Sequence, residues 1–453
     1  MSRIFLISTN TCCSPYTVYP LGMATVAGAL IHAGHCVHQF DWLVANRDEK
    51  LLERAIAEFG PDVVAVSIRN IDPADSLAES DDIRELEDEK NVISLIRRLA
   101  SVPVIIGGPA VSILPDPICK YVGADLAVVG EGEQSIVDAI KAVLGKKSSS
   151  SIWSAANKQL CDEEQGSPYF DESLVAYYRE KSGIIGLQSK RGCPYHCCYC
   201  GYPKIEGVVV RHRPVEAVIA DLERLKHDFK VDTVFFVDSV FNDPDDYYLK
   251  LAEAIAARNL GIKWAAYMSP HGLTKEAVTL CKRAGLYAVE LGTDAAADIT
   301  LEAMCKPFKW DDVKQTNELL VQAGVACAHF VIFGGPEETE VTVRQGLDNI
   351  AGLENCVVMG FSGIRIYPDT LIHKRAMKEG FVKQTDSLLK PVYYTSPKVD
   401  KTWMDNYITQ SWARRRDRVF PPSKGQRIVE TLRSLGYKGL LWERMISPQS
   451  AKI

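Results

Sequence analysis

The 453-residue sequence has no long hydrophobic run and no excess of positive charge. No stretch reaches the roughly 18 uninterrupted apolar residues that cross a membrane. The opening MSRIFLISTNTCCSPYT lacks the basic start and long apolar region of a secretion signal. Lys and Arg total 52 against 58 Asp and Glu, a formal net charge of -6, so the chain has no general attraction to phosphate. We therefore expect a cytoplasmic protein that neither binds nucleic acid nor spans a membrane.

A dinucleotide fingerprint is also missing, because no G-x-G-x-x-G follows the first expected strand. What is present in residues 1–146 is an alternation of apolar runs and helical patterns. Strands are expected at 3–9, 36–42, 62–70, 103–108 and 125–133, which predicts an α/β, doubly wound (Rossmann-like) parallel sheet of five strands. Ligands of such sheets bind beyond the carboxyl ends of the strands. Polar residues and glycines stand at those ends: Thr9, Asn10, Arg69, Asn70, Gly107, Gly108, Gly130 and Gly132.

A second βα series follows a polar, Ser-rich segment at 147–182, whose composition indicates a linker or a connecting segment. Strands are expected at 183–189, 232–239, 262–269, 287–294, 327–335 and 357–367. Six βα units predict an open, partial (β/α)6 barrel over 183–384, with its site at the carboxyl ends of the strands. Residues 385–453 are rich in aromatic residues and Arg, and we expect a small, separate C-terminal cap.

Thirteen cysteines are present. Four of them fall within eight consecutive residues, 193–200, of the segment RGCPYHCCYCGYP. Cys193, Cys197 and Cys200 form C-x3-C-x2-C directly after the first strand of the second series. Three thiolates can hold three irons of a [4Fe-4S] cluster and leave the fourth iron open to a small molecule. A structural zinc site needs a fourth ligand, and no second pair lies nearby. A zinc site or a chance cluster of small buried residues is the alternative, and we expect Cys198 to pack in the core.

With this motif the sequence resembles the radical S-adenosylmethionine (SAM) enzymes over residues 184 to about 380. The resemblance implies that the three cysteines carry the cluster, that the open iron binds SAM, and that a flavodoxin or ferredoxin supplies the electron. It also implies SAM contacts on the later strands. The alternatives are that Asp238 caps a helix and that Glu290 pairs with a core Lys. The implied contacts are Tyr199, Asp238, Ser239, Glu290, Thr293, Asp294, Gly334 and Gly335.

A doubly wound domain ahead of such a barrel resembles the cobalamin-binding class of that superfamily, and residues 107–133 look like its fourth-strand and fifth-strand signature. The resemblance implies a cobalamin site formed by Thr9, Asn10, Arg69, Asn70, Gly107, Gly108, Gly130, Glu131 and Gly132.

No D-x-H-x-x-G string occurs, so we expect base-off cobalamin without a His ligand from the protein. His32, His35 and His38 are expected to be packing or surface residues. The loop SIRNID, residues 67–72, resembles that of the tryptophan 2-methyltransferase of thiopeptide biosynthesis, which places Arg69 at the lower face of the corrin. The alternative is that Arg69 pairs with Asp72 or Asp75 at the end of the sheet.

The resemblance implies a radical SAM methyltransferase that moves a methyl group from methylcobalamin to a carbon of a small-molecule metabolite. A cyclase or rearrangement enzyme that transfers no methyl group is one alternative. A cobalamin- or SAM-binding sensor without turnover is another, from a different class. Neither the substrate nor the oligomeric state follows from the sequence.

Overall fold

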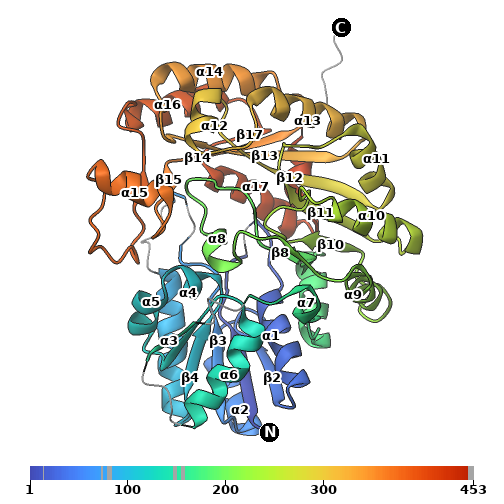
Figure 1. Cartoon of the computed structure of the whole chain (residues 1–453), viewed down its shortest axis with the longest axis vertical. Coiled ribbons are helices and arrows are strands. Elements are labelled where there is room, and N and C mark those ends of the chain that lie inside the picture. The colour runs from blue at the N-terminus through green and yellow to red at the C-terminus, as the bar shows by residue number, and fades with distance from the viewer. Residues whose placement is uncertain (14, 73–74, 79–83, 146–149, 155–158, 447–453) are drawn as a thin grey trace.

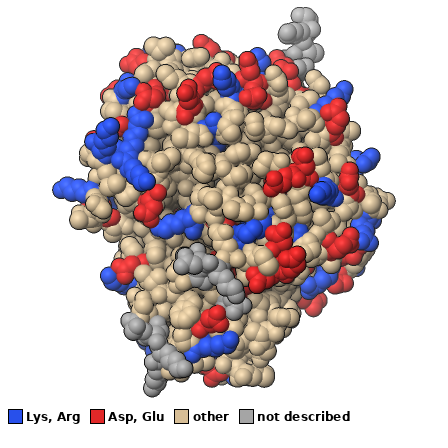
Figure 2. All heavy atoms as spheres, viewed as in Figure 1, with Lys and Arg blue, Asp and Glu red and all other residues tan. Residues whose placement is uncertain are grey.

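The computed structural model describes residues 1–13, 15–72, 75–78, 84–145, 150–154 and 159–446. Two α/β units lie one above the other, with the N-terminus in the lower unit and the Cys loop between them (Figure 1). The expected boundary at 146/147 lies outside the described residues. On the face shown in Figure 2, Lys and Arg alternate with Asp and Glu, and neither sign dominates.

The first unit is a six-stranded parallel sheet in the order β2-β1-β3-β4-β5-β6. Its strands are nearly continuous apolar runs, because helices cover both faces of a parallel sheet. The strand order reverses between β1 and β3, which opens a crevice at the carboxyl ends. The strands are β1 (Arg3–Ser8), β2 (Cys36–Asp41), β3 (Val63–Ser67), β4 (Val104–Gly107), β5 (Leu126–Val129) and β6 (Ile152–Ser154). The helices are α1 (Leu21–His32), α2 (Glu49–Phe59), α3 (Arg84–Leu99), α4 (Pro109–Ile113), α5 (Pro115–Val122) and α6 (Gly132–Leu144).

The doubly wound class is confirmed, but the number of strands was wrong. The sixth strand, β6, comes from the segment that we expected to be a linker, and it pairs with β5. Three residues beside a Ser-rich run carry no periodicity that would reveal a strand. The same segment continues through a 3-10 turn (Asp162–Glu164) into α7 (Glu172–Lys181), so its described part is structured connection.

The second unit is a parallel sheet in the order β17-β14-β13-β12-β11-β10-β7. Its edge strands β7 and β17 do not pair with each other, which confirms the open, partial barrel. The strands are β7 (Ile185–Leu187), β10 (Thr233–Phe236), β11 (Lys263–Met268), β12 (Leu286–Asp294), β13 (Ala326–Phe333), β14 (Val357–Ser362) and β17 (Arg418–Val419). The helices are α9 (Val215–His227), α10 (Tyr247–Arg258), α11 (Lys275–Arg283), α12 (Asp298–Ala303), α13 (Trp310–Gln322) and α14 (Glu340–Ala351).

The C-terminal region is not a separate cap, contrary to our expectation. It contributes β17 to the barrel sheet, and α17 (Pro422–Ser434) and a 3-10 turn, η2 (Leu441–Met445), pack against the inner face of that sheet. Trp442 of η2 is 2% exposed and shares one apolar cluster with Phe235 and Ala265. These apolar residues fill the inside of an open barrel, and that role is invisible without the fold. The remaining helices are α15 (Leu371–Lys378) and α16 (Lys401–Trp412).

Two short antiparallel pairs frame the space between the units. β8 (Lys190–Arg191) and β9 (Arg211–His212) flank the Cys loop, which runs into α8 (Tyr202–Ile205). β15 (Ile364–Arg365) pairs with β16 (Tyr393–Tyr394). None of the described helices combines the length and apolar character that crossing a membrane requires.

Candidate active site

The Cys loop begins with a backbone turn that only glycine fits. Gly192 has a φ of 87°, and a Cβ there would overlap the carbonyl oxygen of Val209. The loop leaves Cys193, Cys197 and Cys200 partly accessible. Cys198 is buried, as expected, and its backbone N–H donates to the Met304 carbonyl at 3.0 Å.

The spacing of the three accessible thiols bears on what they can hold. Among the described residues, one group alone, His212 with Asp243 and Asp245, has its ligand atoms within 4.8 Å of one another. The three loop thiols are therefore too widely spaced to share a single zinc ion, whose sulfur ligands lie about 2.3 Å from the metal. Burial raises the pKa of each of these thiols. A multinuclear cationic cluster fits both the spacing and the need to hold three thiolates.

Lys306 is a site residue that the sequence reasoning missed. Its Nζ lies 3.2 Å from the Cys197 Sγ and forms an ion pair with Asp294 at the carboxyl end of β12. The ammonium group also lies 5.9 Å from the centre of the Tyr199 ring. The Asp294 and Cys197 side chains raise the Lys306 pKa against the opposing effect of burial. Asp294 thus stands beside the Cys loop, which contains Tyr199, and the SAM contacts implied for these two residues stay predictions. No motif marks the lysine, because it lies on a turn far from the loop in sequence.

Asp238 neither caps a helix nor faces the open side of the loop. It is fully buried, and its carboxylate accepts from the Ser189 N–H at 2.7 Å, the Ser189 hydroxyl at 2.5 Å and the Lys190 N–H at 3.2 Å. The Lys190 ammonium is 3.4 Å away and equally buried. The expected SAM contact is therefore corrected: Asp238 positions the segment that leads into the Cys loop.

Ser239 and Thr293 also have partners within the protein. The Ser239 hydroxyl donates to Glu206 at 2.9 Å, and the same Glu206 carboxylate accepts from the Gly192 N–H. Thr293 is fully buried, with its hydroxyl 2.8 Å from His329 Nδ1. Burial lowers the His329 pKa to about 3, so this contact is one between neutral groups. Thr293 packs behind the sheet, and its expected SAM contact is corrected.

Glu290 lies deeper in the barrel than Asp294 and pairs with no lysine. Its Oε1 accepts from the Trp442 indole N–H at 3.0 Å. The alternative of a core Lys partner is therefore wrong, and the SAM contact that the resemblance implied for Glu290 stays a prediction. The two carboxylates are separated along the strand, because it rises about 3.3 Å per residue and Asp294 is the fourth residue after Glu290.

Gly334 and Gly335 form the turn after β13, which ends at Phe333 rather than at residue 335. Gly334 has a φ of 85°, and a Cβ on it would crowd Thr395 and Met404 of the C-terminal region. Its N–H points to the Glu338 carboxylate at 3.3 Å. The turn is thus covered by residues that follow the barrel.

A cavity lies between the carboxyl ends of the two sheets. Most of the glycines and polar residues that we expected at the cobalamin site line it, together with tyrosines from both units. Gly108 must be glycine there, because it has a φ of 111° and its Cβ would lie 2.5 Å from the Ile68 carbonyl oxygen. Thr9 and Asn70 line an adjoining hollow. The lining of the main cavity includes Asn10, Tyr16, Arg69, Gly107, Gly108, Gly130, Glu131, Gly132, Tyr202 and Tyr267.

Arg69 is exposed to this cavity and does not form the alternative ion pair. Asp72 instead contacts Arg365 at 2.7 Å in a buried pair across the two units, and Asp75 accepts from the Leu77 N–H at 3.0 Å. Among the described lining residues there is no histidine. His38 stacks on Phe5 with ring centres 5.1 Å apart, as expected of a packing residue.

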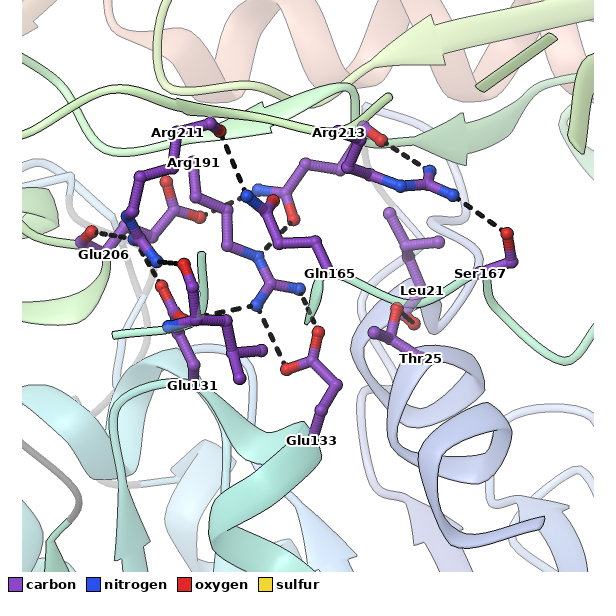
Figure 3. Close-up of polar contacts among 12 residues, drawn as sticks. Leu21, Thr25, Glu131, Glu133, Gln165, Ser167, Arg191, Glu206, Arg211 and Arg213 are labelled. Atoms are coloured by element: carbon purple, nitrogen blue, oxygen red, sulfur yellow. Dashed lines mark hydrogen bonds and ion pairs between the residues drawn. The ribbon is translucent and has the colours of Figure 1, made fainter. Parts of the chain in front are cut away.

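Glu131 holds the two units together rather than facing the cavity with a free carboxylate. It pairs with Arg211 and accepts from the Leu160 N–H at 2.9 Å, while Glu133 binds Arg191 at 2.6 Å (Figure 3). Arg191 immediately precedes the turn into the Cys loop. The glycine turn at 130–132 and the Cys loop are therefore joined by buried ion pairs, and the contact of Glu131 with cobalamin stays a prediction.

Comparison with known families supports the same division. The sequence matches the radical SAM superfamily over residues 187–349 and the B12 binding domain over residues 7–140. The chain combines the two domains of the cobalamin-binding radical SAM enzymes. The two matches coincide with the second and the first parallel sheet, as the resemblance implied.

Several curated relatives of this enzyme are methyltransferases. Tryptophan 2-C-methyltransferase of Streptomyces laurentii is 24% identical, covering 81% of this chain and 73% of that protein. An uncharacterized methyltransferase of Pyrococcus horikoshii is also 24% identical, covering 86% and 87%. Cytidylyl-2-hydroxyethylphosphonate methyltransferase of Streptomyces wedmorensis is 21% identical over 90% of this chain and 89% of its own.

Solved structures share the fold over nearly the whole chain. The radical SAM methyltransferase TsrM of Kitasatospora setae, solved with cobalamin and a [4Fe-4S] cluster, aligns with a TM-score of 0.84 and 20% identity, covering 98% of this chain and 97% of its own. The cobalamin-dependent radical SAM enzyme OxsB aligns with a TM-score of 0.69 and 15% identity over 96% of this chain and 71% of its own.

Proposed function

We propose that this enzyme transfers a methyl group from methylcobalamin to a carbon atom of a small-molecule metabolite. One observation carries the proposal: a single cavity is lined by Arg69 and the glycine turns of the first sheet and also by Tyr202, which lies two residues after Cys200. A molecule bound there would touch the surfaces of both proposed cofactor sites. The curated relatives that are methyltransferases support the same reaction class.

The residues present fit the cofactors that this reaction needs. Cys193, Cys197 and Cys200 would hold the [4Fe-4S] cluster, and the flat cradle of Gly107 and Gly108 would let a corrin approach the backbone. When bound, cluster and SAM supply radical chemistry and cobalamin supplies the methyl group. We propose that cobalamin binds base-off, because no histidine stands among the described lining residues.

The side chains of the chain itself orient and enclose these groups. Asp238 and Lys190 fix the entry to the Cys loop, and Lys306 places a positive charge beside Cys197. Arg69 lines the cavity, and its positive charge would disfavour binding of a cationic ligand to the cobalt of a cobalamin held there. Tyr199, Ser239, Asp294, Gly334 and Gly335 remain proposed surroundings of SAM.

We further propose the domain boundaries, the electron donor and the cellular compartment of this enzyme. The working division is a cobalamin domain over 1–146, a connection over 147–182, a radical SAM domain over 183–384 and a C-terminal part over 385–453 that completes the barrel. We propose a flavodoxin or ferredoxin as electron donor. All thirteen cysteines are free, which suits a reducing compartment such as the cytoplasm.

The test is an anaerobic incubation of reconstituted enzyme with SAM labelled in its methyl group, a low-potential reductant and candidate metabolites, followed by mass spectrometry. A metabolite that gains the label is the expected result. A rearranged metabolite without label, with SAM cleaved, would instead identify a cyclase. Binding of SAM and cobalamin with no consumption of SAM would identify a sensor.

A further inference from the structure

Resting on the proposed methyl transfer, we infer that Glu290 forms the floor of the substrate site inside the barrel, and that this site takes a small molecule carrying an ammonium or N–H donor on an apolar body. Glu290 is 5% exposed and lies on β12 directly beside Tyr267 of β11 in the register of the sheet. Neighbouring residues in register point to the same face. Both side chains therefore face the inside of the barrel.

The carboxylate is unlike the other buried carboxylates of the second unit. The Glu338 carboxylate accepts three hydrogen bonds. Each of the other buried carboxylates of this unit forms an ion pair with a Lys or Arg. Glu290 has one neutral donor among the described residues, the Trp442 indole, which reaches Oε1 and leaves Oε2 without a donor. A buried carboxylate that lacks partners is costly. The paired carboxylates are Asp221, Asp238, Asp243, Asp294 and Asp417.

The residues beside Glu290 in the sheet reach the cavity between the two units. Tyr267 is 38% exposed and lines that cavity with Phe235 and Val237, which come from the neighbouring strand β10 and its end. Tyr16 of the first unit lines the same cavity as Tyr267. Burial raises the pKa of both tyrosines, and the nearby positive charge of Arg69 opposes part of that rise. A line of side chains therefore leads from the proposed corrin face down to the carboxylate.

The chemistry of this wall selects a ligand class. Phe235, Val237 and the tyrosine rings offer apolar and aromatic surface, and Glu290 offers the acceptor at its end. A ligand without a hydrogen-bond donor would bind poorly here, because the Glu290 carboxylate would stay without a partner in an apolar site. It rejects carboxylates more strongly still, because two negative charges would be buried together. An amine or ring N–H at the far end of an apolar substrate meets both requirements.

The test uses two probes with the same ring and opposite charge, phenethylamine and 3-phenylpropionate. Their binding to cobalamin-loaded enzyme without SAM is measured by isothermal titration calorimetry. We expect phenethylamine to bind wild type, 3-phenylpropionate to bind at least tenfold more weakly, and Glu290→Gln to weaken phenethylamine at least tenfold. Glu443→Gln is the matched control, because Glu443 adjoins Trp442 in η2 but interacts with Lys263 and Arg444. It should bind both probes as wild type does.

A second readout reports on the site itself. Trp442 donates to Glu290, so phenethylamine should change the tryptophan fluorescence of wild type and leave that of Trp442→Phe nearly unchanged. Equal binding of phenethylamine to wild type and Glu290→Gln, or no binding to wild type, would overturn the inference. Methyl transfer from SAM to cobalamin is assayed separately without substrate. If it occurs while phenethylamine fails to bind, the inference alone fails; if it does not occur while phenethylamine binds through Glu290, the proposed function alone fails.

Discussion

The Lys306 ammonium lies 3.2 Å from the Cys197 sulfur and at the same time pairs with Asp294. This places one fixed positive charge against a proposed cluster ligand, in a site where burial keeps the screening by water low. We expect Lys306→Met to lower the reduction potential of the reconstituted cluster, because the reduced state carries more negative charge and loses its neighbouring cation. Lys306→Arg should retain most of the wild-type potential. Anaerobic EPR-monitored titration measures both, and an unchanged potential in Lys306→Met would contradict this role.

The cysteine ligands are tested by iron content. We expect reconstituted wild type to hold about four irons per chain. Alanine at Cys193, Cys197 or Cys200 should abolish the cluster, because each supplies one of three protein ligands. Cys198→Ala is the control, since this buried thiol packs away from the loop opening, and it should retain full iron. Full iron in the Cys197→Ala protein would remove the assignment.

The role of Arg69 shows in the cobalamin spectrum. Arg69→Lys keeps a positive charge but loses the planar guanidinium, so it should bind cobalamin with altered reactivity. Arg69→Ala should let water or an added ligand coordinate cobalt. Wild type should show no imidazole splitting in the cobalt EPR spectrum, because no histidine stands among the described lining residues. Unchanged spectra and wild-type methylation in both variants would remove Arg69 from the site.

The buried ion pair between Arg191 and Glu133 joins the two units, and both side chains are about nine-tenths buried. Arg191→Met should lower the free energy of unfolding by roughly 3–5 kcal/mol, because it leaves a buried carboxylate unpaired. Adding Glu133→Gln should restore part of that loss. Denaturant unfolding measures each step, with the exposed pair Arg54–Glu58 as control, where Arg54→Met should change little. Additive losses in the double variant would show that the pair contributes no coupling.

Stability should depend on pH through Glu290. Burial raises the Glu290 pKa from 4.5 to about 7, and the groups facing it, Tyr16, Tyr267, Tyr287 and the Trp442 indole, carry no charge at neutral pH. Since the folded state binds the proton more tightly than the unfolded state, this carboxyl group makes the protein less stable as pH rises from about 4.5 to 7. Glu290→Gln lacks that effect. Its stability relative to wild type should rise by about 3 kcal/mol across this window, and parallel stability profiles of the two proteins would contradict the assignment.

Patterns of residues that are local in sequence could be predicted, and contacts between distant segments could not. The apolar strands, the spacing of the three cysteines and the glycines at strand ends are all local, and they led to the two parallel sheets and to the lining of the cavity. The ion pairs of Asp238 with Lys190 and of Glu131 with Arg211 could not be predicted, because the partners lie on other elements and no motif links them.

The packing of the C-terminal region also could not be predicted from the sequence. Trp442 was grouped with the aromatic residues of a separate cap, but it fills the inside of the barrel and binds Glu290. Whether an aromatic side chain covers a surface or completes a core depends on which face of the sheet is left open. An open barrel leaves the inner face of its sheet uncovered. Which residues cover that face becomes clear only from the folded structure.

The central claim, that this enzyme passes a methyl group through cobalamin, is tested most directly at the cobalt. Enzyme loaded with cob(I)alamin is incubated anaerobically with SAM carrying a 13C-labelled methyl group, and the extracted corrin is analysed by liquid chromatography and mass spectrometry. The account predicts labelled methylcobalamin, formed before any substrate is added. Consumption of SAM with no label on the extracted cobalamin would contradict it.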